Sequence, residues 1–378
     1  MDFQFSEEQQ LLADSVGRLI ENDYDFESRK KLLHSDSGYS DSVWSSLGEM
    51  GVLGIALPEE AGGFGMGITG MVPVMEAVGR GLLLEPLVST MVAARLVQNV
   101  AQDSQAELLG QVAQGAVRLA LAHTEDALDE RPAAVATKAV GSGDAYKLSG
   151  QKIMVLHGPM AQQLVVTART DGKPGDESGL GVFLVDAGAA GLTMHSMRTV
   201  DGYRAADLAL ANVPAKLLGE AGKAFEAIDE AVDFGCMLVC AESIGAMSFA
   251  NETTLEYLKT RKQFGQPIGA FQALQHRMVD MTVSTQQARS MVFMGADALD
   301  RAARGEIDAT TRRKLVSATK IKVADAVRQV GQEAIQLHGG MGMTDEMKVS
   351  HTFKRLTMIG QQFGDVDHHL ARFAANDR

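Results

Sequence analysis

Residues 261–281, RKQFGQPIGAFQALQHRMVDM, carry the strongest signal for the fold, because they join a cationic loop with two glycines and a proline directly to a helix. Arg261 at the start of such a loop can bind a phosphate as a fork, and Phe264 can lie against a flat ring. The same residues also fit a helix C-terminus with favourable charges, ended by glycine and proline. The residues alone leave both interpretations open.

Composition indicates an ordinary globular protein. The 378 residues are 46% hydrophobic and 22% charged, and this length favours two or three domains. The formal net charge of −13 argues against nucleic-acid and membrane partners, since both select basic patches. The start MDFQFSEEQQ is acidic and unlike a signal peptide, and no apolar run approaches the length of a membrane span. We therefore predict a cytoplasmic protein.

The apolar pattern changes twice along the chain. Residues up to about 117 have helical periodicity, with Ser6 in an N-cap position. Short β-type runs such as AYKLSGQKIMVL then follow, separated by glycine, aspartate and proline. Long helical runs return after about residue 220. This order predicts a helical domain at 1–117, a β domain at 118–215 and a helical bundle at 216–378.

A second glycine-rich stretch, IQLHGGMGM, follows a helical run at residues 335–343. Paired glycines such as Gly339 and Gly340 let a backbone approach a ligand closely and expose N–H groups to anions. A plain connection between two helices is the alternative.

Two clusters of residues that could suggest a metal site are better explained by structural roles. Cys236 and Cys240 lie one helical turn apart, too few ligands for zinc and poorly placed for a disulfide, so we predict two buried thiols. His368 and His369 are adjacent and would point in different directions on a helix, for which Asp365 is the predicted N-cap. No metal site is predicted.

Taken together, these segments resemble the acyl-CoA dehydrogenase family. YLKTRKQFGQPIGAFQALQHRMVDM and QLHGGMGMTDE are similar to its two C-terminal signatures, and LGEMGVLGIALPEEAGGFGMG to its N-terminal domain. The resemblance implies an α+β multidomain fold: an N-terminal helical domain, a middle β-barrel-like domain and a C-terminal four-helix bundle. It also implies FAD, an acyl-CoA substrate oxidised at Cα–Cβ to a 2-enoyl-CoA, and an electron-transferring flavoprotein as acceptor.

The resemblance places the family's catalytic glutamate at one of two positions, and both are occupied by other residues. Phe363 stands at one and Gly235 at the other, and neither can take a proton. Asp365 and Asp233 are the nearest substitutes, but each is displaced along its helix, and a misplacement of about 1 Å can cost roughly a hundredfold in rate. We assign no catalytic residue to this chain.

The segments that resemble the family's isoalloxazine site are altered as well. Where the family usually reads TEPGAGSD, this chain reads HTEDALDERPAA and keeps only Thr124 and Glu125. Where the family reads WITNG, it reads MVLHG, with Met154 and Leu156 at the positions that usually contact the flavin. The chain's own isoalloxazine pocket is therefore predicted to be lost.

The half of the FAD site that family members lend to a neighbouring subunit is kept. By resemblance, the residues that would contact the pyrophosphate and adenosine of a partner's FAD are Arg261, Phe264, Gln272, Gln336, Leu337, Gly339 and Gly340.

This combination resembles the non-catalytic subunit, of the pimeloyl-CoA dehydrogenase small-subunit type, in heteromeric bacterial dehydrogenases. Its partner would be a catalytic acyl-CoA dehydrogenase subunit. Two other interpretations stay open: a self-sufficient homo-oligomeric dehydrogenase with a relocated aspartate base, and a non-enzymatic protein for CoA-thioester binding or assembly. The sequence does not predict whether the acyl group is steroid, dicarboxylic or fatty.

Overall fold

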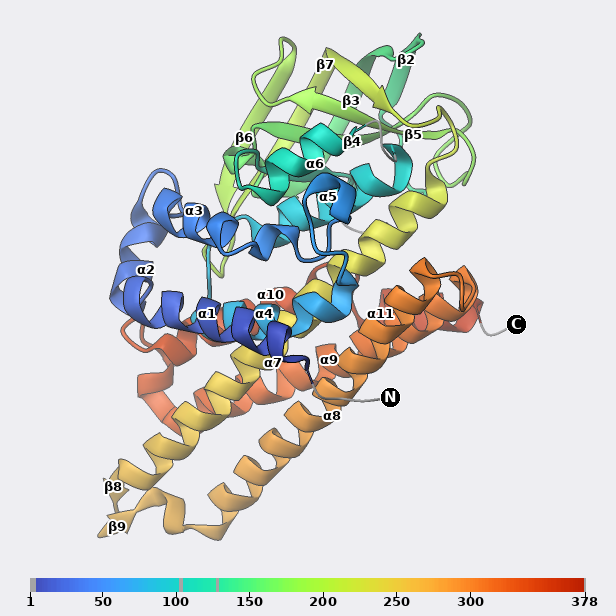
Figure 1. Ribbon diagram of the computed structural model, residues 1–378. Helices are drawn as coiled ribbons and strands as arrows, with labels where there is room; N and C mark the ends of the chain where they lie inside the picture. Colours follow the sequence, from blue (N-terminus) through green and yellow to red (C-terminus); the bar gives the residue numbers. More distant parts are fainter. Residues whose placement is uncertain (1–4, 102–104, 127–128, 377–378) are drawn as a thin grey trace. The chain divides into compact units, whose positions relative to one another are not determined.

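The computed structural model describes residues 5–101, 105–126 and 129–376 (Figure 1). The chain forms two compact units, which we call the helical unit and the β unit. The helical unit comprises Met1–Arg29, Ile68–Leu83 and Cys236–Arg378. The β unit comprises Lys30–Gly67 and Leu84–Gly235. The division into three domains near residues 117 and 215 stays a prediction.

Within the described residues, seven α-helices lie wholly or mainly in the helical unit, and two of them, α4 and α7, begin in the β unit. Their bounds are α1 Glu7–Asp23, α4 Gly67–Gly81, α7 Phe225–Thr260, α8 Gln272–Ala303, α9 Ala309–His338, α10 Lys348–Gln361 and α11 Val366–Ala375. A further helix, α2, spans Phe26–His34 at the boundary between the units. Helices α7 to α10 form the C-terminal bundle, with α11 packed on α9.

Side-chain caps fix where several of these helices begin. Ser6 accepts the backbone N–H of Gln9 at 3.2 Å, and the Gln9 side chain accepts the Ser6 N–H at 2.9 Å, which completes a capping box before α1. Asp365 accepts the His368 N–H at 2.9 Å at the start of α11. The N-caps predicted at Ser6 and Asp365 are therefore confirmed.

Helices α4 and α7 approach each other so closely that only glycine fits at the contact. A Cβ on Gly245 would lie 1.7 Å from the carbonyl oxygen of Glu76, and a Cβ on Gly79 would lie 1.8 Å from that of Glu242. Each helix thus supplies a glycine opposite the other's backbone. This contact sets the position of α7 in the core of the bundle.

By length and composition, one helix in the described part of the chain could cross a membrane. It is α7, but 83% of its most apolar window is buried inside the protein. Burial of this kind is typical of a core helix, so the helix is weak evidence for a membrane span. A cytoplasmic location stays a prediction.

A seven-stranded sheet forms the core of the β unit. Its strands are β1 Leu119–Ala122, β2 Lys138–Ser142, β3 Ala145–Leu156, β4 Gln163–Arg169, β5 Leu180–Asp186, β6 Leu192–Arg198 and β7 Arg204–Leu218. The strand path β4–β2–β3–β7–β5 closes on itself, because β4 pairs with both β2 and β5. The sheet is therefore barrel-like, as the family resemblance implied.

Apolar side chains fill the inside of this sheet, and helices cover it. Val166 of β4 faces Phe183 of β5 in the antiparallel register, and both are fully buried. Helix α5 (Leu87–Ala101) packs on β1, where Thr90 donates to the Leu119 carbonyl at 3.2 Å. The remaining helices of this unit are α3 (Asp41–Glu49) and α6 (Ala106–Ala113).

Candidate cofactor site

The RKQFG stretch forms a tight hairpin between α7 and α8, at the end of the bundle where α7 ends and α8 begins (Figure 1). Strand β8 (Lys262–Gln263) pairs with β9 (Gln266–Pro267), and the turn residues Phe264 and Gly265 have φ of 53° and 81°. Positive φ at both central residues is the pattern of a two-residue hairpin turn, which glycine adopts freely and a bulky residue rarely does. The turn therefore holds Phe264 in a strained conformation.

The side chains of this hairpin point to solvent. Phe264 is 88% exposed, and its ring lies edge-to-face with the ring of Phe271, with centroids 6.0 Å apart. Arg261 is exposed, and its guanidinium has no hydrogen bond or ion pair with any residue that the structure describes. Gln272, the first residue of α8, is exposed as well. These groups are free to meet a ligand.

The glycine-rich stretch forms a 3-10 turn, η6 (Gly339–Met343), directly after α9. Gly339 has φ 61° and ψ −144°, a conformation open essentially to glycine alone. No atom lies within 4 Å of a Cβ built on Gly339 or Gly340, so the space beside both is open. Gln336 is exposed, whereas the Leu337 side chain is 5% exposed and belongs to the core. Only the backbone of Leu337 could meet a cofactor.

Two side-chain contacts bring the hairpin and the glycine turn to the same end of the bundle. The rings of Tyr257 on α7 and His338 on α9 stack with centroids 4.6 Å apart. Arg277 on α8 pairs with Glu333 on α9 at 2.5 Å. The structure thus gathers the predicted cofactor-binding residues of both signatures, which lie more than 60 positions apart in the sequence.

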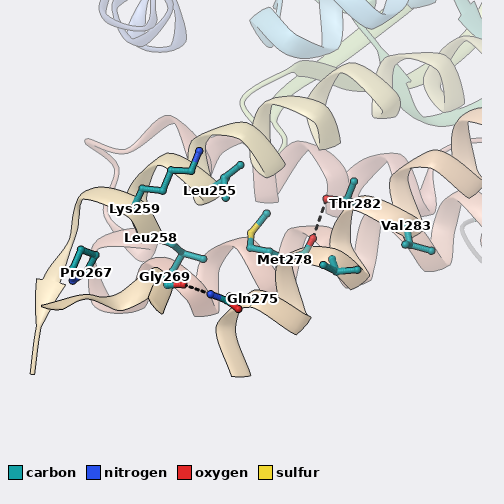
Figure 2. A pocket seen from close by; sticks show the side chains of 10 residues that line it. Leu255, Leu258, Lys259, Pro267, Gly269, Gln275, Met278, Thr282 and Val283 are labelled. Carbon is teal, nitrogen blue, oxygen red and sulfur yellow. Dashed lines mark hydrogen bonds between the residues drawn. The ribbon is translucent and has the colours of Figure 1, made fainter. Parts of the chain in front are cut away.

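An apolar groove of about 670 Å³ lies beside the hairpin, between the end of α7 and the start of α8 (Figure 2). Its apolar lining includes Leu255, Leu258, Met278, Val279 and Val283. Polar groups come from Lys259 and from Gln275, whose amide donates to the Gly269 carbonyl at 2.9 Å. Sequence reasoning missed this groove, because its two walls come from different helices.

Neither aspartate considered as a substitute base is free. The Asp365 carboxylate accepts the backbone N–H of His368 as the N-cap of α11, and losing such a cap costs about 1 kcal/mol. Asp233 is 1% exposed within α7. Phe363 follows α10 with φ 58°, and its carbonyl accepts from His369 Nε2 at 2.9 Å. The turn at Phe363 is therefore fixed by buried contacts and carries no proton acceptor on its side chain.

A buried glutamate that sequence reasoning missed, Glu242, is also engaged. Arg355 donates from Nε and Nη2 to the two carboxylate oxygens of Glu242 at 2.5 and 2.6 Å, and both side chains are essentially fully buried. Arg355 also donates to Gln362 at 3.1 Å. Both oxygens of this carboxylate are occupied by the bidentate pair, so it is poorly placed to act as a base. The only sequence signal was a glutamate within the apolar run of α7.

The predicted burial of both cysteines is confirmed: Cys236 and Cys240 are free thiols with no exposure. His369 is buried beside α9 and lies 3.2 Å from the Ser317 hydroxyl through Nδ1. In the described residues, no group of three or more His, Cys, Asp or Glu side chains is arranged to hold a metal ion.

Glu125, one of the two residues kept from the family's flavin loop, is part of a buried ion pair. Lys152 Nζ donates to Glu125 Oε1 at 2.7 Å and to the His123 carbonyl at 2.9 Å. The Glu125 carboxylate also accepts the backbone N–H groups of Ala136 and Thr137, at 2.7 and 3.1 Å. Glu125 therefore ties its loop to the sheet, and its oxygens face inward partners.

Burial and charge together set the ionisation of this cluster. Burial alone would raise the pKa of Glu125, but the Lys152 charge and the hydrogen bonds outweigh it and leave that pKa lowered. Burial lowers the pKa of Lys152 to about 8, although Glu125 opposes the shift. Burial, followed by the Lys152 charge, lowers the pKa of His123 to about 3, so its ring is neutral. The Nδ1 atom of this ring lies 2.9 Å from the Thr167 hydroxyl oxygen.

Met154 and Leu156, which stand at the two other positions where the family usually contacts the flavin, have no hydrogen-bond donor on their side chains. Met154 is exposed with φ 51°, at an irregularity in the β3–β7 pairing, and its backbone N–H donates to Asp207 at 2.9 Å. Leu156 packs against the small apolar cluster that contains Tyr203. Neither side chain can donate a hydrogen bond to a flavin ring.

Three family models match consecutive parts of the chain. They are the acyl-CoA dehydrogenase N-terminal domain at residues 6–116, the middle domain at 120–213 and the C-terminal domain at 222–373. Together with the helical and barrel-like parts described above, these matches define the acyl-CoA dehydrogenase fold. The chain belongs to the acyl-CoA dehydrogenase family, whose cofactor is FAD and whose reaction is acyl-CoA oxidation.

Known relatives match nearly the whole chain. The mitochondrial isovaleryl-CoA dehydrogenase of Arabidopsis thaliana is 30% identical over 315 residues, covering 81% of this chain and 75% of that protein. A solved variant of the Tcur3481–Tcur3483 steroid ACAD is 30% identical with a TM-score of 0.87, covering 98% and 97%. The ChsE4–ChsE5 complex from Mycobacterium tuberculosis has a TM-score of 0.87 at 24% identity, covering 99% and 98%, and shows likeness of fold alone.

Proposed function

We propose that this chain is the non-catalytic subunit of a heteromeric, FAD-dependent acyl-CoA dehydrogenase. In this proposal the hairpin and the glycine turn bind the pyrophosphate and adenosine of an FAD whose flavin ring lies in a catalytic partner subunit. One observation carries the proposal. Phe264 is 88% exposed and the Arg261 guanidinium has no hydrogen bond or ion pair with a described residue, whereas Phe363 and Gly235 stand where the family has its base.

The residues present fit one half of the cofactor and not the other. Arg261 can donate two parallel hydrogen bonds to a phosphate, and the open space at Gly339 and Gly340 lets a backbone approach it. In the β unit, Met154 and Leu156 offer the flavin ring no side-chain donor. The likeness to a steroid ACAD whose name joins two proteins agrees with a heteromeric assembly.

This division of roles implies where the reaction would occur. The partner would hold the acyl-CoA, supply the carboxylate that removes the α proton and orient the flavin that takes the β hydrogen. Electrons would then leave to an electron-transferring flavoprotein. Here, Arg261 and the glycine turn would act on the cofactor alone.

The first test is the visible absorption spectrum of the chain, purified alone and co-expressed with a catalytic acyl-CoA dehydrogenase subunit. The proposal predicts a colourless chain alone and a yellow complex. A chain that is yellow alone, with turnover lost on Asp365→Asn or Asp233→Asn, would instead identify a self-sufficient dehydrogenase. A chain without flavin in either preparation would favour a non-enzymatic role in CoA-thioester binding or assembly.

The second test is Arg261→Ala in the yellow complex. Loss of the phosphate-binding fork should let FAD leave on dialysis while the complex stays assembled. Arg261→Lys keeps the charge without the fork and should retain an intermediate fraction. Lys262→Ala, which removes the adjacent exposed cation, is the matched control and should retain FAD. If the Arg261→Ala complex keeps its FAD, the proposed role of the hairpin is wrong.

A further inference from the structure

The stack between Tyr257 and His338 lies directly behind both parts of the proposed site. Tyr257 is in the last turn of α7, and its carbonyl accepts the backbone N–H of Arg261 at 2.9 Å. His338 is the last residue of α9 and is followed at once by Gly339. The two rings are inclined by only 28°, with centroids 4.6 Å apart. One ring contact therefore joins the base of the hairpin to the base of the glycine turn.

His338 is held in one orientation and one protonation state. Its Nδ1 donates to the Ala334 carbonyl at 2.8 Å, so the proton is on Nδ1 and Nε2 carries a lone pair. The side chain is 2% exposed, and Nε2 has no hydrogen-bond partner among the residues that the structure describes. Burial lowers the pKa of His338, with the Ala334 hydrogen bond opposing it, which favours the neutral ring. A fixed, neutral ring is a rigid surface for Tyr257.

We infer that Tyr257 and His338 are positioning residues that set the spacing between the hairpin and the glycine turn. Arg261 lies four residues after Tyr257 and Gly339 lies one residue after His338, so both directly follow the helix ends that the stack joins. The partly exposed Arg277–Glu333 pair is a second brace, but ion pairs of that exposure contribute little. The inference rests on the proposed function, because it concerns the same cofactor half-site.

The test compares substitutions that keep or remove the ring. FAD is titrated into the flavin-stripped complex of both subunits, and quenching of flavin fluorescence gives the dissociation constant. Tyr257→Leu keeps apolar bulk without a ring and should raise the dissociation constant about three- to tenfold, the range expected for one aromatic pair. Tyr257→Phe keeps the ring and should stay within about twofold of the wild type. His338→Phe, which restores a flat ring without the imidazole, should also bind FAD.

Thermal unfolding of the same variants separates positioning from plain stability. A purely structural stack would lower the unfolding midpoint of Tyr257→Leu and leave the dissociation constant unchanged at low temperature, and this result would overturn the inference. The inference about the stack also fails if Tyr257→Leu binds FAD like the wild type while Arg261→Ala binds it more weakly. In that case the proposed function still stands. If Arg261→Ala also binds normally, the proposed function itself fails. If the Tyr257→Leu chain does not assemble with its partner, comparing the FAD affinity of His338→Leu with that of His338→Phe tests the same loss of a ring.

Discussion

The hairpin at 261–267 and the loop at 123–137 both resemble FAD-contacting segments of the family, and they differ in where their polar groups find partners. In the hairpin, Arg261 has no partner in the described chain and Phe264 is exposed in a strained conformation. In the loop, the Glu125 carboxylate accepts from Lys152 and from two backbone N–H groups. Arg261 and Phe264 are exposed, whereas the Glu125 carboxylate is engaged by partners inside the protein.

This difference teaches that a retained family residue need not retain the family's role. Glu125 has a structural role in this chain, because it supplies the counter-charge of the buried Lys152. No internal contact explains Arg261, and an exposed aromatic at positive φ is a cost to the isolated chain. The hairpin is therefore better explained by an external ligand than by the fold.

The largest expected effect is in the loop. Lys152→Met would leave the Glu125 carboxylate buried without its cation, and the free energy of unfolding should fall by about 3–5 kcal/mol. Urea denaturation followed by circular dichroism measures the change.

Two controls sharpen that result. The double substitution Glu125→Gln with Lys152→Met should recover part of the loss, because the unpaired buried charge is removed. Arg261→Met should change stability by less than about 0.5 kcal/mol, as expected for an exposed side chain. Equal losses for Lys152→Met and Arg261→Met would contradict the comparison.

The second effect is a pH dependence of the same loop. The pKa of His123 is about 3 in the fold and should be about 6.5 in the unfolded chain. As pH falls between these values the unfolded state takes up the proton first, so stability should decrease by at most about 1.4 kcal/mol per pH unit. Urea midpoints at several pH values should show a smaller slope in His123→Asn than in the wild type. Parallel slopes would mean that His123 does not contribute.

A third prediction contrasts two glycines. Gly340→Ala should leave the stability of the chain nearly unchanged, because its Cβ meets open space. In the complex it should weaken FAD binding about tenfold, since the methyl group occupies the space of a close backbone approach. The matched control is Gly245→Ala, whose Cβ would lie 1.7 Å from the Glu76 carbonyl oxygen and should destabilise the bundle. Unchanged FAD affinity in Gly340→Ala would count against a cofactor at the turn.

The smallest expected effect has opposite signs for stability and binding. Phe264→Asn places a residue that tolerates positive φ in the turn and should stabilise the free chain by up to about 1 kcal/mol. It also removes the exposed ring and should weaken FAD retention in the complex several-fold. Thermal unfolding and dialysis measure the two effects. If stability rises and FAD retention does not change, the ring has no part in binding.

Much of the fold could be predicted from the sequence, because regular elements repeat a local pattern. The run AYKLSGQKIMVL coincides with β3. Ser6 and Asp365 are N-caps whose side chains accept the backbone N–H of a residue only three positions later, so both caps are local features of the sequence. Strand β2 was not predicted, because its five residues, KAVGS, include a glycine and carry too short an alternation of apolar and polar residues. The β8–β9 hairpin was not predicted either. A strand of two residues has no periodicity, and phenylalanine is a poor signal for a turn that requires positive φ.

By itself the sequence determined the family, the order of helices and strands, and the absence of glutamate at positions 235 and 363, because these depend on residue identity and local pattern. Only the tertiary structure decided which charged side chains have a hydrogen-bond or ion-pair partner. Glu242 finds Arg355 113 positions away, and Glu125 finds Lys152 27 positions away, whereas Arg261 finds no partner in the described chain. Partner choice between distant residues depends on how the helices and strands pack, which a local pattern does not contain.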